Sequence, residues 1–239
     1  MKISHTLLLL LSLSLIGCAN EPASIFKQEG GFIAPGENDY GEDFFVPDEE
    51  EFVEVPEESD EDDLSEFDFV DPTGAVPSRA REHALRYFKA NQDRFSNKQY
   101  ITIIDFNKHS GNKRFFVMNM QFGNVSTYYT SHGSGSDPSD TGYAKKFSNT
   151  TNSHMSSVGF YRTAETYHGN NGYSLRLDGL SSTNSKARSR AIVVHGASYV
   201  NSSRSKMGRS WGCPALDFNY SRDVIGKIKG GSLILAWNG

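Results

Sequence analysis

The charge of this chain is divided sharply between two segments, and that division limits where a folded core can form. Residues 21–71 hold 20 acidic residues and one basic residue, a net charge of −19, whereas residues 73–239 hold 22 basic and nine acidic residues, a net charge of +13. The acidic segment is also interrupted by prolines, and it cannot bury enough apolar surface to offset the entropy of ordering its backbone. We therefore predict a disordered acidic linker over residues 18–72 and one folded domain over residues 73–239, a length that suits a single core.

The N-terminal residues carry an apolar run from Leu7 to Ile16 that ends at Gly17 and Cys18. A helix needs about 20 apolar residues to cross a bilayer, so this shorter run predicts a signal peptide over residues 1–17. The small residue before the Cys resembles the lipobox of bacterial lipoproteins, which implies cleavage before Cys18 and acylation of its thiol and amine. The alternative is an ordinary signal peptide with a coincidental Cys.

The lipobox resemblance also implies a cellular location. Two or three acyl chains on one Cys anchor a protein stably, so we expect membrane attachment by the lipid anchor only. Ala19 and Asn20 follow Cys18 without an Asp at the next position, which indicates sorting to the outer membrane of a Gram-negative bacterium. We expect a periplasmic, lipid-anchored protein whose linker serves as a solvated tether or carries docking motifs.

Secondary-structure signals after residue 73 favour a mainly β domain. Ala80, Ala84 and Leu85 recur at helical spacing after Ser78, which we predict to be the N-cap. Apolar runs then predict strands over residues 100–106, 114–121, 125–131, 174–177, 191–195 and 232–237, and a short helix over residues 221–229. Short strands with Gly-, Ser- and Asn-rich connections predict a β barrel or sandwich with a few short helices.

Cys213 and His195 carry the strongest chemical signal in this domain. His195 ends an apolar run and precedes Gly196, and Cys213 follows 18 residues later, directly after Gly212. Residues on such loops often serve function. We predict that His195 takes the thiol proton and holds the thiolate as an ion pair, and that backbone N–H groups beside the sulfur bind an oxyanion. Positive charge from Arg209 would favour the thiolate further. The alternative is a small buried Cys and a core His.

The residues around this pair resemble a known family. The pieces that carry the resemblance are His195-Gly196 and Ser210-Trp211-Gly212-Cys213, together with residues 147–149, 156–161 and 208–216. They are similar to the signature of the L,D-transpeptidase (YkuD-type) catalytic domain, in the branch described as murein L,D-transpeptidases. The resemblance covers roughly residues 78–237. It implies a mainly β fold with Cys213 as the nucleophile and His195 as the base.

The resemblance implies further site residues. Ser210 joins the catalytic group because it shapes the nucleophile loop, and the substrate-binding candidates are Gly196, Arg209, Trp211, Gly212, Gly159, Tyr161 and His132. His132 ends another β run, where a structural loop role is the alternative. The sequence departs from the family pattern at two places. Pro214 and Ala215 stand where an Arg often follows the Cys, and Trp211 stands where His is common. These departures bear on substrate preference more than on acyl chemistry.

The function that the resemblance implies is acyl transfer on peptidoglycan stem peptides through a Cys213 thioester. An amine of another stem as acceptor would give a 3→3 crosslink, and a lysine of an envelope protein would give a covalent wall anchor. One alternative is an L,D-carboxypeptidase or endopeptidase, in which water accepts the acyl group. A second alternative is a non-catalytic peptidoglycan-binding lipoprotein.

Other functional classes lack their sequence signals. No His-Glu-x-x-His motif and no close Cys/His pairing occurs in the chain, so we expect no metal site and no cofactor. The nine acidic residues of the domain are scattered singly, which argues against a glycosidase carboxylate pair. The export signal argues against nucleic acid as the partner of the basic domain, and anionic envelope polymers fit its charge better.

Overall fold

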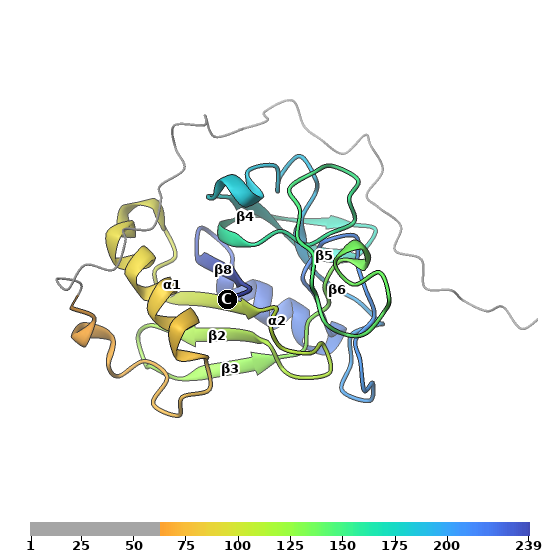
Figure 1. Cartoon of the computed structure of the whole chain (residues 1–239). Coiled ribbons are helices and arrows are strands. Elements are labelled where there is room, and N and C mark those ends of the chain that lie inside the picture. Colours follow the sequence, from red (N-terminus) through yellow and green to blue (C-terminus); the bar gives the residue numbers. More distant parts are fainter. Residues whose placement is uncertain (1–62) are drawn as a thin grey trace, which may run out of the picture. The chain divides into compact units, whose positions relative to one another are not determined.

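The computed structural model describes residues 63–239, which form one barrel-like, curved sheet with helices packed on it (Figure 1). The spatial order of the strands is β3-β2-β1-β8-β4-β5-β6-β7. The strands are β1 Tyr100–Asp105, β2 Phe115–Asn119, β3 Val125–Tyr128, β4 Gly159–Gly169, β5 Gly172–Gly179, β6 Val193–Gly196, β7 Ala215–Leu216 and β8 Leu233–Trp237. The predicted mainly β fold is confirmed. The predicted signal peptide, the acyl site at Cys18 and most of the predicted linker lie outside the described residues.

Two α-helices in the described part, α1 (Ser78–Ala90) and α2 (Phe218–Ile228), pack on opposite faces of the central strands. Successive side chains of a strand point to opposite faces. Ile103 and Leu235 accordingly join the core under α1, whereas Ile104 and Ile234 join the core under α2. Burial on both faces explains why β1 and β8 are nearly continuous apolar runs. Within residues 63–239, no helix is both long and apolar enough to cross a bilayer.

Most of the predicted elements are present, with shifted ends. α1 begins at Ser78, the residue predicted to be its N-cap; Pro77 occupies the N-cap position instead, and no side chain caps the helix. α2 begins three residues earlier than predicted, because the Asp217 carboxylate accepts a bond of 2.8 Å from the backbone N–H of Asn219. The predictions missed β4, the longest strand, which pairs with both β5 and β8.

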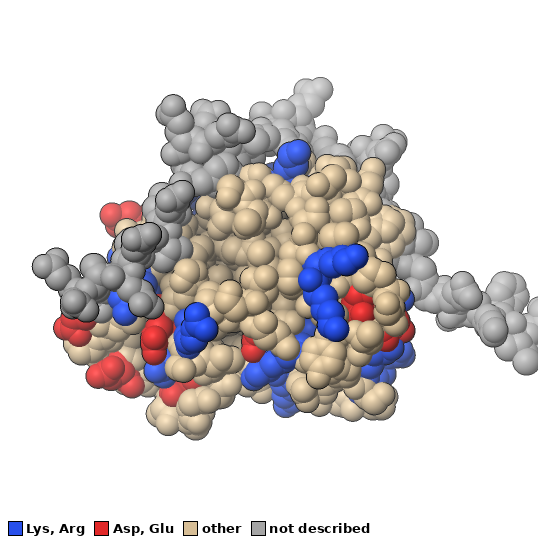
Figure 2. Space-filling model, viewed as in Figure 1, with Lys and Arg blue, Asp and Glu red and all other residues tan. Residues whose placement is uncertain are grey.

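The folded region begins before the predicted boundary at residue 73. Phe67 and Val70 are buried in the core under α1. The buried Asp71 carboxylate accepts bonds from the backbone N–H groups of Ala75 (2.8 Å) and Val76 (2.9 Å), which fixes the approach to α1. Charge composition placed the boundary too late because these few apolar residues lie within an acidic segment. In Figure 2, acidic side chains gather at the left edge, over the first described residues.

Candidate active site

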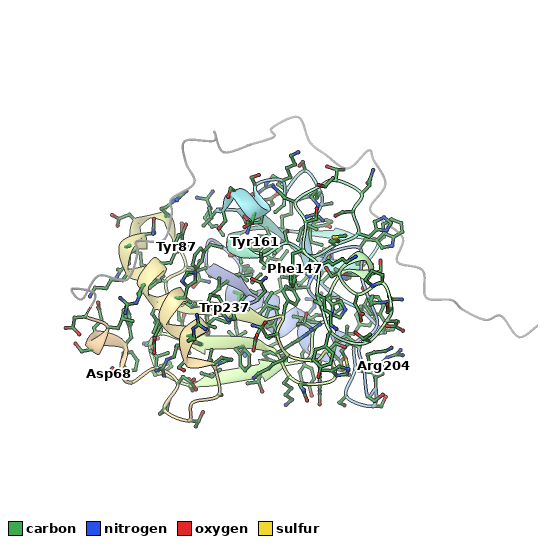
Figure 3. The ribbon with its side chains drawn as sticks, viewed as in Figure 1. Asp68, Tyr87, Phe147, Tyr161, Arg204 and Trp237 are labelled. Atoms are coloured by element: carbon green, nitrogen blue, oxygen red, sulfur yellow. The ribbon has the colours of Figure 1, made fainter. Side chains whose placement is uncertain are left out.

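The pairing of β6 with β7 brings the predicted base and nucleophile to the same place. The two strands are parallel, and the Cα of His195 in β6 pairs with that of Ala215 in β7. Cys213 lies two residues before Ala215, so the 18-residue separation in sequence closes to neighbouring strands. The connecting loop extends outward to Arg204, at the edge of the molecule in Figure 3, before it returns to Cys213.

The Cys213 thiol is buried against the backbone that leads into β6. The sulfur lies 3.5 Å from the N–H of Val193 and 3.5 Å from the carbonyl oxygen of Ala191, whose φ is +53°. Only 3% of the Cys213 surface is exposed. Burial raises the pKa of the thiol to about 11, and the Val193 N–H and the Arg190 guanidinium oppose that rise. The resting group is therefore a neutral thiol.

His195 is held by its own strand. Its Nδ1 lies 2.9 Å from the carbonyl oxygen of Gly196. A carbonyl only accepts hydrogen bonds, so Nδ1 carries the proton and Nε2 is the basic nitrogen of the neutral ring. Burial lowers the pKa of His195. The main-chain carbonyl thus has the orienting role that an acidic side chain has in many nucleophile–base pairs.

These two pKa directions set the resting protonation of the pair. The thiol pKa of Cys213 lies far above that of the His195 imidazole, so the proton stays on sulfur. The ion pair predicted from sequence is therefore not the resting state, because burial disfavours both charged forms. If the two residues act as the predicted nucleophile and base, proton transfer from Cys213 to His195 has to accompany attack on a substrate.

The nucleophile loop takes its shape from Ser210 and Gly212. The Ser210 hydroxyl donates to the Cys213 carbonyl oxygen (2.7 Å) and accepts from the Gly212 N–H (3.1 Å). Gly212 has a φ of +127°, and a Cβ there would lie 2.7 Å from the Met155 carbonyl oxygen. Both conditions require glycine. Ser210 therefore supports the loop and does not bond to the sulfur.

Ser131, His132 and Ser156 bond to the backbone of this loop. The Ser131 hydroxyl donates to the Cys213 carbonyl oxygen (3.2 Å), the Ser156 hydroxyl donates to the Gly212 carbonyl oxygen (3.0 Å), and the Ser210 N–H donates to the His132 carbonyl oxygen (2.9 Å). These bonds satisfy the polar backbone that a buried loop would otherwise leave unpaired. They also restrict where Cys213 can move.

His132 does not border the cleft as predicted, because its side chain is fully buried. Its Nδ1 lies 2.7 Å from Nη2 of Arg114, and its Nε2 lies 3.4 Å from a carboxylate oxygen of Asp137. Burial and the Arg114 charge lower the pKa of His132 to about 4, so the ring is neutral near pH 7. The alternative structural role is the one that the geometry supports.

Arg209 does not supply the charge that the sequence assigned to it. Its Nη1 donates to the Asp137 carbonyl oxygen (2.6 Å), and its Nε lies 3.3 Å from the Asp140 carboxylate. The guanidinium that acts on the pKa of Cys213 is that of Arg190, directly before Ala191. Arg190 was not predicted from the sequence, because only its position shortly before the apolar run that ends at His195 pointed to it.

The other predicted substrate-binding residues differ in exposure. Tyr161 is buried, and its hydroxyl lies 2.8 Å from the Ser157 carbonyl oxygen; Figure 3 shows it in the interior of the domain. A Cβ on Gly159 would lie 2.7 Å from the Ser181 hydroxyl, and one on Gly196 would lie 2.5 Å from the Phe218 ring, so both glycines allow close packing. The substrate-binding roles predicted for these three positions stay predictions.

Trp211 is the predicted residue that faces solvent beside the nucleophile. It is 41% exposed and stacks on His154, with ring centroids 4.5 Å apart and ring planes 7° apart. Among residues 63–239, no group of three or more His, Cys, Asp or Glu side chains is placed to hold a metal ion.

The fold and the site define a mainly β protein with a Cys–His nucleophile pair. Residues 73–237 match the family model of the L,D-transpeptidase catalytic domain, and the chain belongs to this family. No curated protein matches the chain.

Several solved structures are similar to the chain. One is an L,D-transpeptidase from Mycobacterium smegmatis, with 13% identity, a TM-score of 0.38 and 58% of each chain covered. Another is L,D-transpeptidase 3 from Mycobacterium tuberculosis in complex with a faropenem-derived adduct, with 12% identity, a TM-score of 0.38, and 59% of this chain and 60% of that chain covered. A third is Bd1075 from Bdellovibrio bacteriovorus, with 14% identity, a TM-score of 0.37, and 62% and 50% covered. The chain spans less than two thirds of the length of each of these proteins.

Proposed function

We propose that this chain is a cysteine-dependent L,D-transpeptidase that acts on peptidoglycan stem peptides. The observation that carries the proposal is the site itself. His195 is fixed through Nδ1 to a main-chain carbonyl, and the β6–β7 register places it beside the loop that holds Cys213, within the residues that match the family. A nucleophile, a base of defined tautomer and a rigid loop are the parts that acyl transfer through a thioester requires.

In the first half-reaction, Cys213 Sγ adds to the carbonyl carbon of the third stem residue, meso-diaminopimelate or its equivalent, while the thiol proton passes to His195 Nε2. The oxyanion that forms needs a hydrogen-bond donor. The Gly212 N–H already donates to the Ser210 hydroxyl, so we assign this role to the Cys213 N–H. Collapse of the intermediate breaks the bond to D-Ala, whose amine leaves with the proton from His195.

In the second half-reaction, an acceptor attacks the thioester carbonyl and gives a proton to His195, and that proton returns to the departing sulfur. An amine of a second stem gives a 3→3 crosslink. A lysine of an envelope protein gives a covalent wall anchor, and water gives a shortened stem. The net charge of +13 over residues 73–239 suits approach to an anionic polymer. In the view of Figure 2, Lys and Arg side chains are scattered over the surface, with Asp and Glu side chains among them.

The proposal includes a location. We propose that the protein works in the periplasm, attached by acyl chains on Cys18 and sorted to the outer membrane. Support comes from the short apolar run before Cys18 and from a family whose substrate is cell wall. Radiolabelled palmitate incorporated into wild-type protein but not into Cys18→Ala would support it. Equal incorporation in both would contradict it.

The test of the reaction is product analysis after incubation with disaccharide-tetrapeptide. The protein used begins at residue 19, and Cys213→Ala is the control. A dimeric product that requires Cys213 would support transpeptidation. A tripeptide product alone would reassign the chain as an L,D-carboxypeptidase. No Cys213-dependent product, with binding to peptidoglycan retained in both proteins, would favour the wall-binding alternative.

A further inference from the structure

We propose that Arg190 is a positioning residue of this site, whose fixed guanidinium charge stabilises the Cys213 thiolate that forms during acyl transfer. The role of Arg190 in acyl transfer rests on the proposed function. Its effect on the ionisation of the Cys213 thiol does not. Arg190 thereby takes the electrostatic role that the sequence suggested for Arg209.

The Arg190 guanidinium is fixed by hydrogen bonds from both terminal nitrogens. Nη1 donates to the Ser148 carbonyl oxygen (2.7 Å) and to the Ser157 hydroxyl (3.3 Å), and Nη2 donates to the Met155 carbonyl oxygen (2.6 Å) and to the Ser153 hydroxyl (3.3 Å). These four contacts engage both arms of the planar guanidinium fork. They also occupy the terminal N–H groups that would otherwise bind a substrate carboxylate. The guanidinium therefore acts on the thiol through its fixed charge and not by binding the substrate.

The same contacts tie Arg190 to the walls around the sulfur. Arg190 directly precedes Ala191, whose carbonyl oxygen lies 3.5 Å from Sγ. The Met155 carbonyl oxygen that Nη2 binds is also the atom that a Cβ on Gly212 would approach to 2.7 Å. Arg190 therefore bridges residues 148–157 and the backbone that holds Cys213.

The charge of Arg190 is not cancelled by a carboxylate. Within residues 63–239, the ion pairs engage other cations: Asp178 and Glu165 pair with Arg188, and Asp140 pairs with Arg209. Half-buried charges without a partner act strongly on their neighbours because water screens them less.

The other titratable groups around the thiol differ from Arg190 in charge. His195 is neutral at rest, because burial lowers its pKa. Burial raises the pKa of Tyr161 to about 12 and also raises the pKa of Tyr199, so both phenols are neutral. A negative charge on Cys213 raises the two pKa values further. The thiol pKa itself responds to Arg190 in the direction that stabilises the thiolate.

The test measures alkylation of Cys213 by iodoacetamide as a function of pH, by mass spectrometry, on protein that begins at residue 19. Cys213 is its only thiol. The variants are Arg190→Gln, Arg190→Lys and, as the matched control, Arg204→Gln at an exposed position. We expect Arg190→Gln to alkylate on the order of tenfold more slowly at a pH below the thiol pKa, which corresponds to a rise of about one pKa unit. Arg190→Lys should recover most of this rate, and Arg204→Gln should match wild type.

Thermal melting separates the charge from a structural role. If Arg190→Gln does not fold, the Arg190→Lys variant decides alone. An alkylation rate that follows the wild-type pH profile supports the role of the charge, and a rate tenfold below wild type contradicts it. If both variants fold and their profiles shift equally, or neither shifts, the inference is wrong. Because alkylation requires no peptidoglycan, a failure of the proposed function would appear separately, as wild-type protein that alkylates normally but yields no muropeptide product.

Discussion

Burial sets the chemical state of Cys213 more than nearby charge does. The sulfur lies under the backbone of Ala191 and Val193, and its pKa is raised to about 11 although a guanidinium and an N–H group favour the thiolate. His195 is neutral for the same reason, since burial lowers its pKa. A neutral thiol is less reactive toward oxidants than a thiolate, and in the proposed mechanism the proton transfer takes place at the moment of attack.

The first prediction at this scale concerns the pH dependence of the thiol. The rate of iodoacetamide alkylation of Cys213 should rise steadily with pH from 6 to about 10, because the thiolate fraction grows tenfold per unit below the pKa. A plateau beginning near neutral pH would show a preformed ion pair with His195 and would contradict the neutral resting state. Mass spectrometry of the intact protein measures the rate, and Cys213→Ala controls for other sites.

The second residue-scale prediction concerns Ser210. Ser210→Ala removes the bonds to the Gly212 N–H and the Cys213 carbonyl, so the loop should lose about 1–2 kcal/mol of stability, and acylation of Cys213 should slow. The thiol pKa should stay near its wild-type value, because the hydroxyl does not bond to the sulfur. Exposed Ser202→Ala is the matched control. Complete loss of alkylation in folded Ser210→Ala would instead indicate direct action on the thiol.

The sequence identified some of these residues and misassigned others, for physical reasons. Cys213 and His195 were recognisable because each lies beside a glycine in a characteristic motif. Arg190 was not, because its role depends on carbonyl groups of residues 148–157 that meet it only in the fold. Arg209 lies near Cys213 in sequence, yet Asp140 and the Asp137 carbonyl hold it.

At the scale of elements, the buried Thr163 hydroxyl joins β4 to the connection between α2 and β8. Thr163 Oγ1 donates to the Ile228 carbonyl oxygen (2.7 Å) at the end of α2 and accepts from the N–H groups of Gly231 (3.1 Å) and Ser232 (2.8 Å). The hydroxyl thereby satisfies the backbone between α2 and β8. This connection fixes the helix that packs beneath β6 and the site.

Thr163→Val keeps the shape of the side chain but leaves the N–H groups of Gly231 and Ser232 without this acceptor, while the Ser232 hydroxyl still donates to the Ile228 carbonyl oxygen. It should therefore lower the free energy of unfolding by about 2 kcal/mol or more. The measurement is urea denaturation followed by circular dichroism. Thr166→Val, half-buried on the same strand, should change stability little. Equal stability of the two variants would show that the Thr163 bonds are unimportant.

The strands that sequence predicted and the strand that it missed differ in burial. β1 and β8 were predictable because helices cover both of their faces, which makes them continuous apolar runs. β4 carries Arg162, Glu165 and His168 among its eleven residues, and its outer half is largely exposed. Its partners β5 and β8, rather than its own composition, make it a strand.

At the scale of the whole molecule, the domain is larger than charge composition indicated. The acidic segment contributes its last residues to the fold, where Phe67 packs against Phe88 with ring centroids 6.4 Å apart. The boundary between linker and domain therefore lies inside the acidic run, and a truncation at residue 73 would remove part of the core.

Phe67→Ala should lower the free energy of unfolding by about 3 kcal/mol, because it removes a buried aromatic ring from the core under α1. Phe69→Ala is the matched control, since Phe69 is 49% exposed and two residues away. Thermal or urea denaturation measures both. Equal stability of the two variants would place the segment outside the cooperative fold.

The central claim is that Cys213 forms an acyl-enzyme with a peptidoglycan stem, and the intact mass of the protein tests it most directly. Protein that begins at residue 19 is incubated briefly with disaccharide-tetrapeptide and denatured in acid, and its intact mass is measured by mass spectrometry. The Cys213→Ala and His195→Gln variants are treated in the same way. We predict an added mass equal to the substrate minus D-Ala, located on Cys213, absent from Cys213→Ala and strongly reduced in His195→Gln. An unmodified wild-type protein in the presence of released D-Ala, or an adduct that persists in Cys213→Ala, would contradict the account.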